Sequence, residues 1–156
     1  MVSTETDKLL VNLAKIETGI SRIYGHLSQM DNFTNPAKKF WMTMQDEELG
    51  HAEVFNDIRE RAKVDDSFEF EIDIDLKELK DFVEKVNKLL EKIKKGGITE
   101  SEAYSFGSLI EAEFDEAEFL KKIKTSDAGI AKKIKQIAND TKKHNLLLVN
   151  YSRGIR

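Results

Sequence analysis

The chain has 156 residues, a net charge of −4 and no cysteine, and 35% of its residues are charged. This length fits one domain, so we expect a single domain over residues 1–156. Without cysteine, disulfides, thiolate metal sites and cysteine nucleophiles are excluded, and any metal must be held by oxygen and imidazole. The acidic balance argues against a nucleic-acid partner, because binding phosphate needs a concentrated basic surface.

The N-terminal segment MVSTETDKLL lacks the apolar region of a secretory signal. No apolar run approaches the roughly 20 residues that span a bilayer. We therefore expect a cytoplasmic protein with no membrane partner. The single proline and the high charged fraction favour long amphipathic helices, hence an all-α fold.

The first two predicted helices follow from apolar periodicity. Apolar residues recur at steps of three and four from Leu9 to Met30, which predicts one long helix with Ser3 or Thr4 as the N-cap. Asn35 before Pro36 is typical of an N-cap and a first helical position. The second helix is expected to end near Ala62.

The middle of the chain predicts a connector and an additional helix. Residues 64–76 alternate acidic and apolar side chains without a helical period, which indicates an extended connector or a short edge strand rather than a real sheet. A helix is expected from about Asp75 to Lys95, closed by Gly96 and Gly97. It is inserted between the second and third helices of the predicted bundle.

The last third of the chain predicts two more bundle helices. Thr99 and Glu102 form a capping-box pattern that opens a helix running to about Lys124. Ser126 or Asp127 caps a final helix that continues nearly to the C-terminus. Four long helices, one inserted helix and one long crossover together predict a four-helix bundle.

Candidate metal ligands lie in each of the four bundle helices. Glu48 and His51, three residues apart, lie about 60° apart around a helix axis and can aim at one point. An oxygen-rich shell with a few nitrogens suits iron or manganese, so we expect two iron ions, with manganese as the alternative. Glutamates at the edge of an apolar stripe can also be simply solvated, which is the alternative for the single glutamates. The full set of candidates is Glu17, Glu48, His51, Glu113, Glu116 and His144.

One position departs from the pattern of carboxylate and histidine at a spacing of three. Thr141 stands three residues before His144, where a glutamate is expected. Asp140, four residues before His144, is a candidate replacement ligand. Its shorter side chain and its rotation of about 100° from position 141 weigh against that role.

Two aromatic residues lie near the candidate ligands. Tyr24 follows Glu17 by seven residues, which places it on the same helix face about 10 Å along the axis. It is our candidate catalytic residue, able to hydrogen-bond a ligand or an oxygen species, and the alternative is a core tyrosine with a locally satisfied hydroxyl. Trp41, seven residues before Glu48, is interpreted as core packing rather than as an electron-transfer residue.

These residues resemble the ferritin-like superfamily, and within it the rubrerythrin family. The resemblance spans nearly the whole chain and rests on Glu17 with Tyr24, on EELGHA around Glu48 and His51, on Glu113 with Glu116, and on His144. A second glutamate one turn beyond the ligand of the third bundle helix is a feature of rubrerythrins. The resemblance implies a ferritin-like bundle, usually dimeric, with a non-haem di-iron centre that reacts with hydrogen peroxide or dioxygen in oxidative-stress defence.

Two departures from rubrerythrins leave three hypotheses open. The chain has no cysteine-rich rubredoxin domain, so an external electron donor would be required, and Thr141 removes a carboxylate. The first hypothesis is a di-iron peroxidase or oxidase, and the second is a metal-binding or iron-handling protein with one occupied site. The third is a metal-free scaffold that acts through protein contacts made by the inserted helix.

Overall fold

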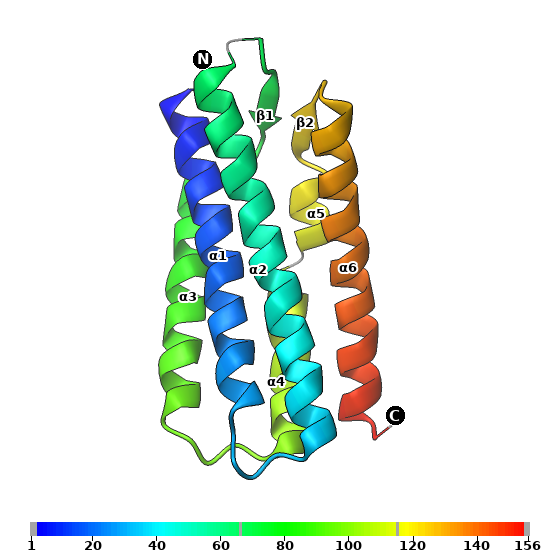
Figure 1. Cartoon of the computed structure of the whole chain (residues 1–156). Helices are drawn as coiled ribbons and strands as arrows, with labels where there is room; N and C mark the ends of the chain where they lie inside the picture. Colours follow the sequence, from blue (N-terminus) through cyan, green and yellow to red (C-terminus); the bar gives the residue numbers. More distant parts are fainter. Residues whose placement is uncertain (1–2, 66, 115, 155–156) are drawn as a thin grey trace.

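The computed structural model describes residues 3–65, 67–114 and 116–154 and is predominantly helical, as predicted. Within these residues, six helices and two short strands follow one another along the chain (Figure 1). They are α1 (Thr4–Ser28), α2 (Asn35–Val64), β1 (Phe70–Ile72), α3 (Leu76–Lys94), α4 (Glu100–Glu113), α5 (Glu116–Leu120), β2 (Ile123–Thr125) and α6 (Ala128–Ser152). None of the described helices is long and apolar enough to cross a membrane.

Helices α1, α2, α4 and α6 surround a common interior, and α3 lies outside them against α1 (Figure 1). Gly19 of α1 permits this close packing, because a Cβ atom at Gly19 would lie only 2.5 Å from Cγ1 of Val86 on α3. Gly96 and Gly97 follow α3 with φ angles of 76° and 82°, which favour glycine. The inserted helix and its glycine end are therefore confirmed.

Side-chain caps define most of the helix starts. Thr99 and Glu102 form the predicted capping box in both directions, and Asp127 accepts the predicted hydrogen bond at the start of α6. The N-cap of α2 is Thr34, whose hydroxyl accepts from the backbone of the first turn, so Asn35 is the first helical residue rather than the cap. The sequence thus placed this boundary one residue late.

The segment after α4 differs from the prediction. The helix expected to run to Lys124 ends at Glu113, because Phe114 leaves helical geometry with φ −92° and ψ 78°. After α5, strand β2 pairs antiparallel with β1, matching Phe70 with Thr125 and Ile72 with Ile123. A small sheet therefore exists where the sequence predicted none, because residues on both segments alternate in and out over three positions.

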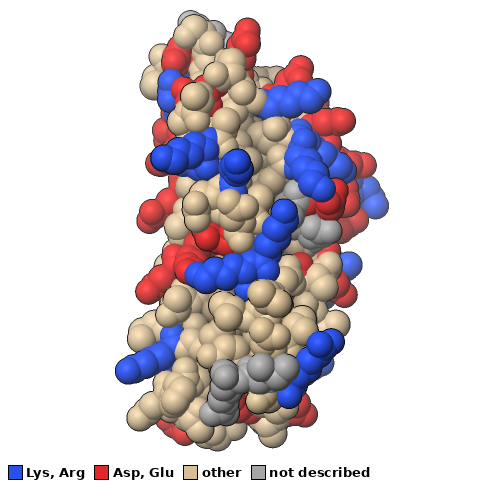
Figure 2. All heavy atoms as spheres, turned by 90° about the vertical axis from the view of Figure 1, so that its right-hand side faces the viewer, with Lys and Arg blue, Asp and Glu red and all other residues tan. Residues whose placement is uncertain are grey.

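The face formed by β2, α5 and α6 is turned to the viewer in Figure 2. Lysine and arginine side chains stand in separate groups across it, with tan areas between them and most acidic side chains towards its margins. A surface groove on this face has Leu120, Ile123 and Ile134 in its lining. Lysine side chains also line the groove, namely Lys121, Lys124, Lys135 and Lys142.

Candidate metal centre

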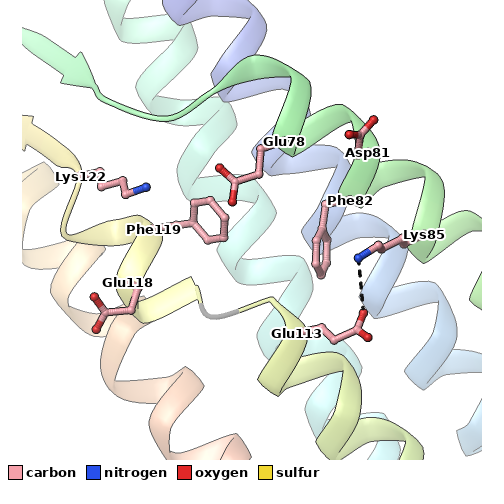
Figure 3. A pocket seen from close by; sticks show the side chains of 8 residues that line it. All are labelled: Glu78, Asp81, Phe82, Lys85, Glu113, Glu118, Phe119 and Lys122. Atoms are coloured by element: carbon pink, nitrogen blue, oxygen red, sulfur yellow. Dashed lines mark ion pairs between the residues drawn. The ribbon is translucent and has the colours of Figure 1, made fainter.

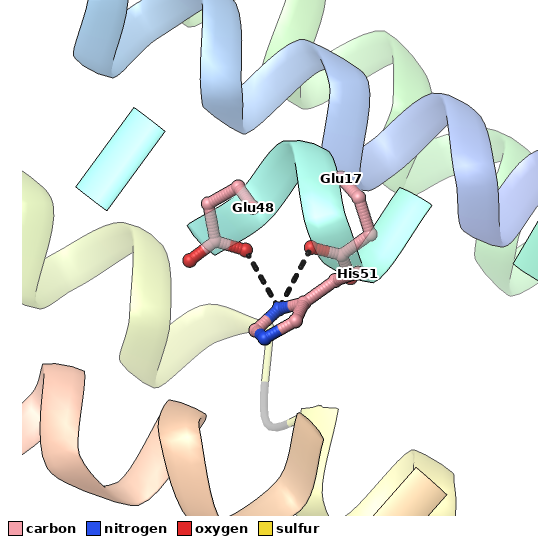
Figure 4. Close-up of side chains that lie close together, drawn as sticks. All are labelled: Glu17, Glu48 and His51. Atoms are coloured by element: carbon pink, nitrogen blue, oxygen red, sulfur yellow. Dashed lines mark hydrogen bonds and ion pairs between the residues drawn. The ribbon is translucent and has the colours of Figure 1, made fainter. Parts of the chain in front are cut away.

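The first ligand group joins α1 and α2 in the interior. Glu17, Glu48 and His51 each offer one ligand atom within 4.8 Å of the others, and all three are buried (Figure 4). Nδ1 of His51 lies 3.2 Å from Oε2 of Glu48 and 3.9 Å from Oε2 of Glu17. The predicted i, i+3 spacing therefore does aim the carboxylate and the imidazole at one point.

The second ligand group shares Glu48 and adds residues from α4 and α6. Glu48, Glu111 and His144 again place one ligand atom each within 4.8 Å of one another, all buried. Nδ1 of His144 lies 2.9 Å from Oε1 of Glu48, while Oε2 of Glu48 contacts His51. Glu48 thus stands between the two imidazole rings, whose centroids are 6.0 Å apart.

Each histidine is also contacted from outside by a carboxylate on the helix of the other histidine. Nε2 of His144 lies 2.5 Å from Oε2 of Glu47 on α2, and Nε2 of His51 lies 3.7 Å from Oδ2 of Asp140 on α6. Glu47 precedes His51 by four residues, and Asp140 precedes His144 by four. Glu47 accepts from Nε2–H of His144, which directs Nδ1 of His144 to the interior, whereas the Asp140 contact is longer than a hydrogen bond.

This geometry revises the expected role of Asp140. The side chain contacts the outer nitrogen of His51 rather than the interior between the two ligand groups. Its short reach keeps it at the flank of α6, where it is 24% exposed. Asp140 therefore does not take the place of the carboxylate missing at position 141.

Burial and charge have opposite effects on the pKa values of Glu48 and His144. Burial alone would raise the pKa of the Glu48 carboxyl, but its contacts with His144 and His51 outweigh this and hold the pKa well below its usual range. Burial would likewise lower the pKa of His144, yet the contact with Glu48 prevails and raises the pKa to about 9. In the metal-free protein, protonated His144 is therefore the cation that balances Glu48 near neutral pH.

Tyr24 is fully buried and contacts the second ligand group. Its hydroxyl donates a hydrogen bond of 2.5 Å to Oε1 of Glu111. Burial raises the pKa of Tyr24 well above its usual range, and the negative charge of Glu111 adds to this. Tyr24 therefore remains a neutral donor near neutral pH, and its position beside a candidate ligand agrees with one of the two predicted roles.

Glu113 lies away from both ligand groups. Its side chain is 58% exposed and reaches Lys85 of α3 at 4.0 Å, on the rim of a surface pocket (Figure 3). The structure thus does not bring this predicted ligand to the interior. The side chain of Glu116, the other predicted ligand of this region, lies outside the described residues.

Glu111 is the interior glutamate of α4 that the sequence analysis missed. Two residues on a helix differ by about 200° around its axis, so Glu111 and Glu113 point in nearly opposite directions. Glu111 follows Gly107 by four residues and Tyr104 by seven, and both of these are buried. That spacing was the available signal, but Glu113 was selected instead because it adjoins the apolar Phe114.

Thr141 takes a position on α6 equivalent to that of Glu48 on α2. It precedes His144 by three residues, is 2% exposed, and donates a hydrogen bond of 3.1 Å to the carbonyl oxygen of Ile137. Its hydroxyl is thus turned towards its own helix. The threonine that stands where the pattern expects a glutamate therefore lies in the interior beside the ligand groups.

The buried donor set could hold a metal ion. Three buried carboxylates, from Glu17, Glu48 and Glu111, face two imidazoles, and burying that much negative charge is costly unless cations balance it. Oxygen donors with two terminal nitrogens suit iron or manganese better than soft metals. Comparisons of the chain with protein-family models, with curated proteins and with solved structures found no match in any of the three.

Proposed function

We propose that the chain is a ferritin-like, rubrerythrin-like protein that binds two iron ions at this centre, with manganese as the alternative, and reduces hydrogen peroxide or dioxygen. The observation that carries the proposal is the sharing of Glu48 between two buried ligand groups. A carboxylate between two imidazoles could serve both ions, while each imidazole would hold one of them.

The residues of the chain have separate tasks in this proposal. Glu17 and His51 would hold one ion, Glu111 and His144 the other, and Glu48 both. Two ferrous ions would supply the two electrons that reduce one peroxide molecule to water. Tyr24 orients Glu111 through its hydrogen bond, and the low exposure of the whole cluster excludes bulk water.

Glu47 prepares His144 for this task. Glu47 accepts from Nε2 of His144, which leaves Nδ1 as the nitrogen that faces the centre. Metal binding at Nδ1 must displace the proton that His144 carries near neutral pH, so binding releases a proton. An external donor of electrons and a homodimeric assembly belong to the same proposal.

An anaerobic titration of the metal-free protein with ferrous iron tests the proposal. We expect two ions per chain, and peroxide should then oxidise the bound iron with the appearance of an absorption band of oxo-bridged ferric iron. Glu111→Gln should weaken binding by roughly tenfold or more. Glu113→Gln is the matched control from the same helix and should leave binding unchanged. No bound iron, or equal effects of the two variants, would refute the proposed centre.

A second candidate is a metal-binding protein that holds one ion and has no useful turnover. The observation in its favour is Thr141, whose hydroxyl is bonded to the backbone where the pattern expects a carboxylate. A stoichiometry of one ion per chain, without repeated turnover of peroxide, would support it over the first candidate. The titration above distinguishes the two.

A further inference from the structure

Four aromatic rings, one each from α1, α2, α4 and α6, form a continuous series that begins beside the candidate metal centre. The centroids of Tyr24 and Trp41 are 5.2 Å apart, and those of Trp41 and Tyr104 are 5.3 Å apart. The ring of Tyr151 continues the series at 4.9 Å from Tyr104, and the last two pairs are stacked. We call Tyr24, Trp41, Tyr104 and Tyr151 the ring series.

The composition of the ring series is not what packing alone requires. The chain contains nine phenylalanines, three tyrosines and one tryptophan. All three tyrosines and the tryptophan stand in the series, while Phe40 lies beside it and contacts three of its rings. Tyrosine and tryptophan lose an electron far more readily than phenylalanine, so the easily oxidised rings of the chain all belong to the ring series.

The inner end of the series has a place for a proton. The hydroxyl of Tyr24 donates to Oε1 of Glu111, a member of the second ligand group. When a phenol loses an electron, it becomes a strong acid and its proton moves to a bonded acceptor. Glu111 is that acceptor, so the hydrogen bond stabilises an oxidised Tyr24 as a neutral radical.

In the middle of the series, the described residues offer no acceptor for the proton of an oxidised ring. Trp41 is fully buried, and its indole N–H has no hydrogen-bond partner among the residues that the structure describes. If Trp41 loses an electron, its proton has no acceptor, so the oxidised ring remains a strong oxidant and passes the charge on. Trp41 is therefore suited to relay an electron rather than to store an oxidising equivalent, which would add to the core-packing role expected from the sequence.

The outer end of the series approaches the surface. Tyr24 and Trp41 are fully buried, Tyr104 is 4% exposed, and Tyr151 is half-buried. Tyr151 lies in the last turn of α6, at the end of the molecule where that helix terminates (Figure 1). An electron donor outside the chain can therefore approach Tyr151 without reaching the interior.

We propose that the ring series carries single electrons from a one-electron donor at Tyr151 to the candidate metal centre at Glu111, an inference that rests on the proposed function. In each passage Tyr24 gives one electron to the centre and its phenolic proton moves to Glu111. Trp41 then gives an electron to Tyr24, and the proton moves back. Tyr104 next gives an electron to Trp41, Tyr151 gives one to Tyr104, and the donor gives one to Tyr151. Two passages would return to the centre the two electrons that one peroxide, with two protons, takes up on conversion to two water molecules.

Photo-oxidation of the metal-free protein tests the relay without using its activity. The chain has no cysteine, so a ruthenium photo-oxidant attached to Arg153→Cys, an exposed position two residues beyond Tyr151, labels one site. After a flash in the presence of a quencher, tyrosyl and tryptophan radicals are followed by transient absorption and electron paramagnetic resonance. We expect a tyrosyl radical at Tyr24, identified by its loss in Tyr24→Phe.

Two variants in the labelled protein show whether the electron follows the series. Trp41→Phe keeps an aromatic ring but removes the relay, and should lower the yield of the Tyr24 radical at least tenfold. Phe40→Leu removes a neighbouring ring that is not part of the series and should leave the yield unchanged. If Trp41→Phe does not fold, Tyr104→Phe, which removes only a hydroxyl group, tests the same step with the same expected loss.

Two results would overturn the relay: no radical at Tyr24 in the labelled parent, or an equal yield after the Trp41 and Tyr104 substitutions. The outcome does not depend on iron, because the experiment uses the metal-free protein. If iron fails to bind while the radical still reaches Tyr24, the proposed metal centre is refuted and electron transfer along the rings stands. If iron binds but no radical reaches Tyr24, the opposite holds.

Discussion

The metal-free protein should lose stability as the pH rises through about 9, because His144 then loses the proton that it shares with Glu48. The pKa of His144 is about 9 in the folded protein and 6.5 in an unfolded chain. This difference corresponds to roughly 3 kcal/mol of stabilisation, and the same contact lowers the pKa of Glu48, so the two shifts are not added.

The direction follows from which state binds the proton more tightly. A group whose pKa is raised on folding contributes its full stabilisation below the unfolded pKa, here 6.5, and loses it as the pH rises through about 9. Glu48, whose pKa is lowered, contributes above its unfolded pKa of 4.5 and loses this as the pH falls. The contact between Glu48 and His144 is therefore most stabilising between pH 4.5 and pH 6.5, the unfolded pKa values of the two groups.

Urea denaturation of the metal-free protein between about pH 6.5 and 10 measures the effect. The control is His144→Gln, which shares the titration of every other group with the parent. The difference in unfolding free energy between the two proteins should shrink by about 3 kcal/mol across this range. A difference that stays constant would refute the charged pair. With iron bound, the sign reverses, because the metal requires the neutral imidazole.

Two further substitutions test the interior around the centre. Thr141→Glu should raise iron affinity roughly tenfold, which is measured as about 1.4 kcal/mol of additional stabilisation of the fold by iron. The control Thr141→Gln should not raise it. Equal gains in both variants would contradict the idea that a carboxylate is missing at position 141. Gly107→Ala should destabilise the protein by about 1–3 kcal/mol in urea denaturation, because the new Cβ would lie 2.9 Å from side-chain atoms of Leu148 and Trp41. The control is Gly50→Ala, whose Cβ would meet nothing within 4 Å, and it should stabilise α2 by about 0.5–1 kcal/mol. If the unfolding free energies of the Gly107→Ala and Gly50→Ala variants change in the same direction, this account of the packing at Gly107 is wrong.

The helices were predictable because local signals agree with one another. Apolar periodicity fixed the buried face of α1, and that face carries Glu17 into the interior as expected. On α2, the i, i+3 spacing of Glu48 and His51 needs only helical geometry to bring both side chains together. The capping box at Thr99 likewise depends on residues three positions apart.

The two main errors lie at the end of α4 and just after it, and they have different origins. Glu111 and Glu113 both precede the break at Phe114, so the phase of α4 alone separates them. Glu113 was selected because it adjoins the apolar Phe114, although it is exposed and Glu111 is buried. The strand β2 was missed because its three residues pair with a segment more than fifty positions away in the chain, a contact that no local period reports.

The consequence of Thr141 follows from the pairing of α2 with α6. Glu47 and Asp140 each precede a histidine by four residues, and each contacts the histidine of the opposite helix. Thr141 is thus the counterpart of Glu48, the carboxylate that both ligand groups share. By this equivalence, a glutamate at position 141 would also have been shared. In the two-ion proposal its replacement by threonine would therefore weaken the hold on both ions, and a count of one ion per chain would contradict this equivalence and favour the second candidate.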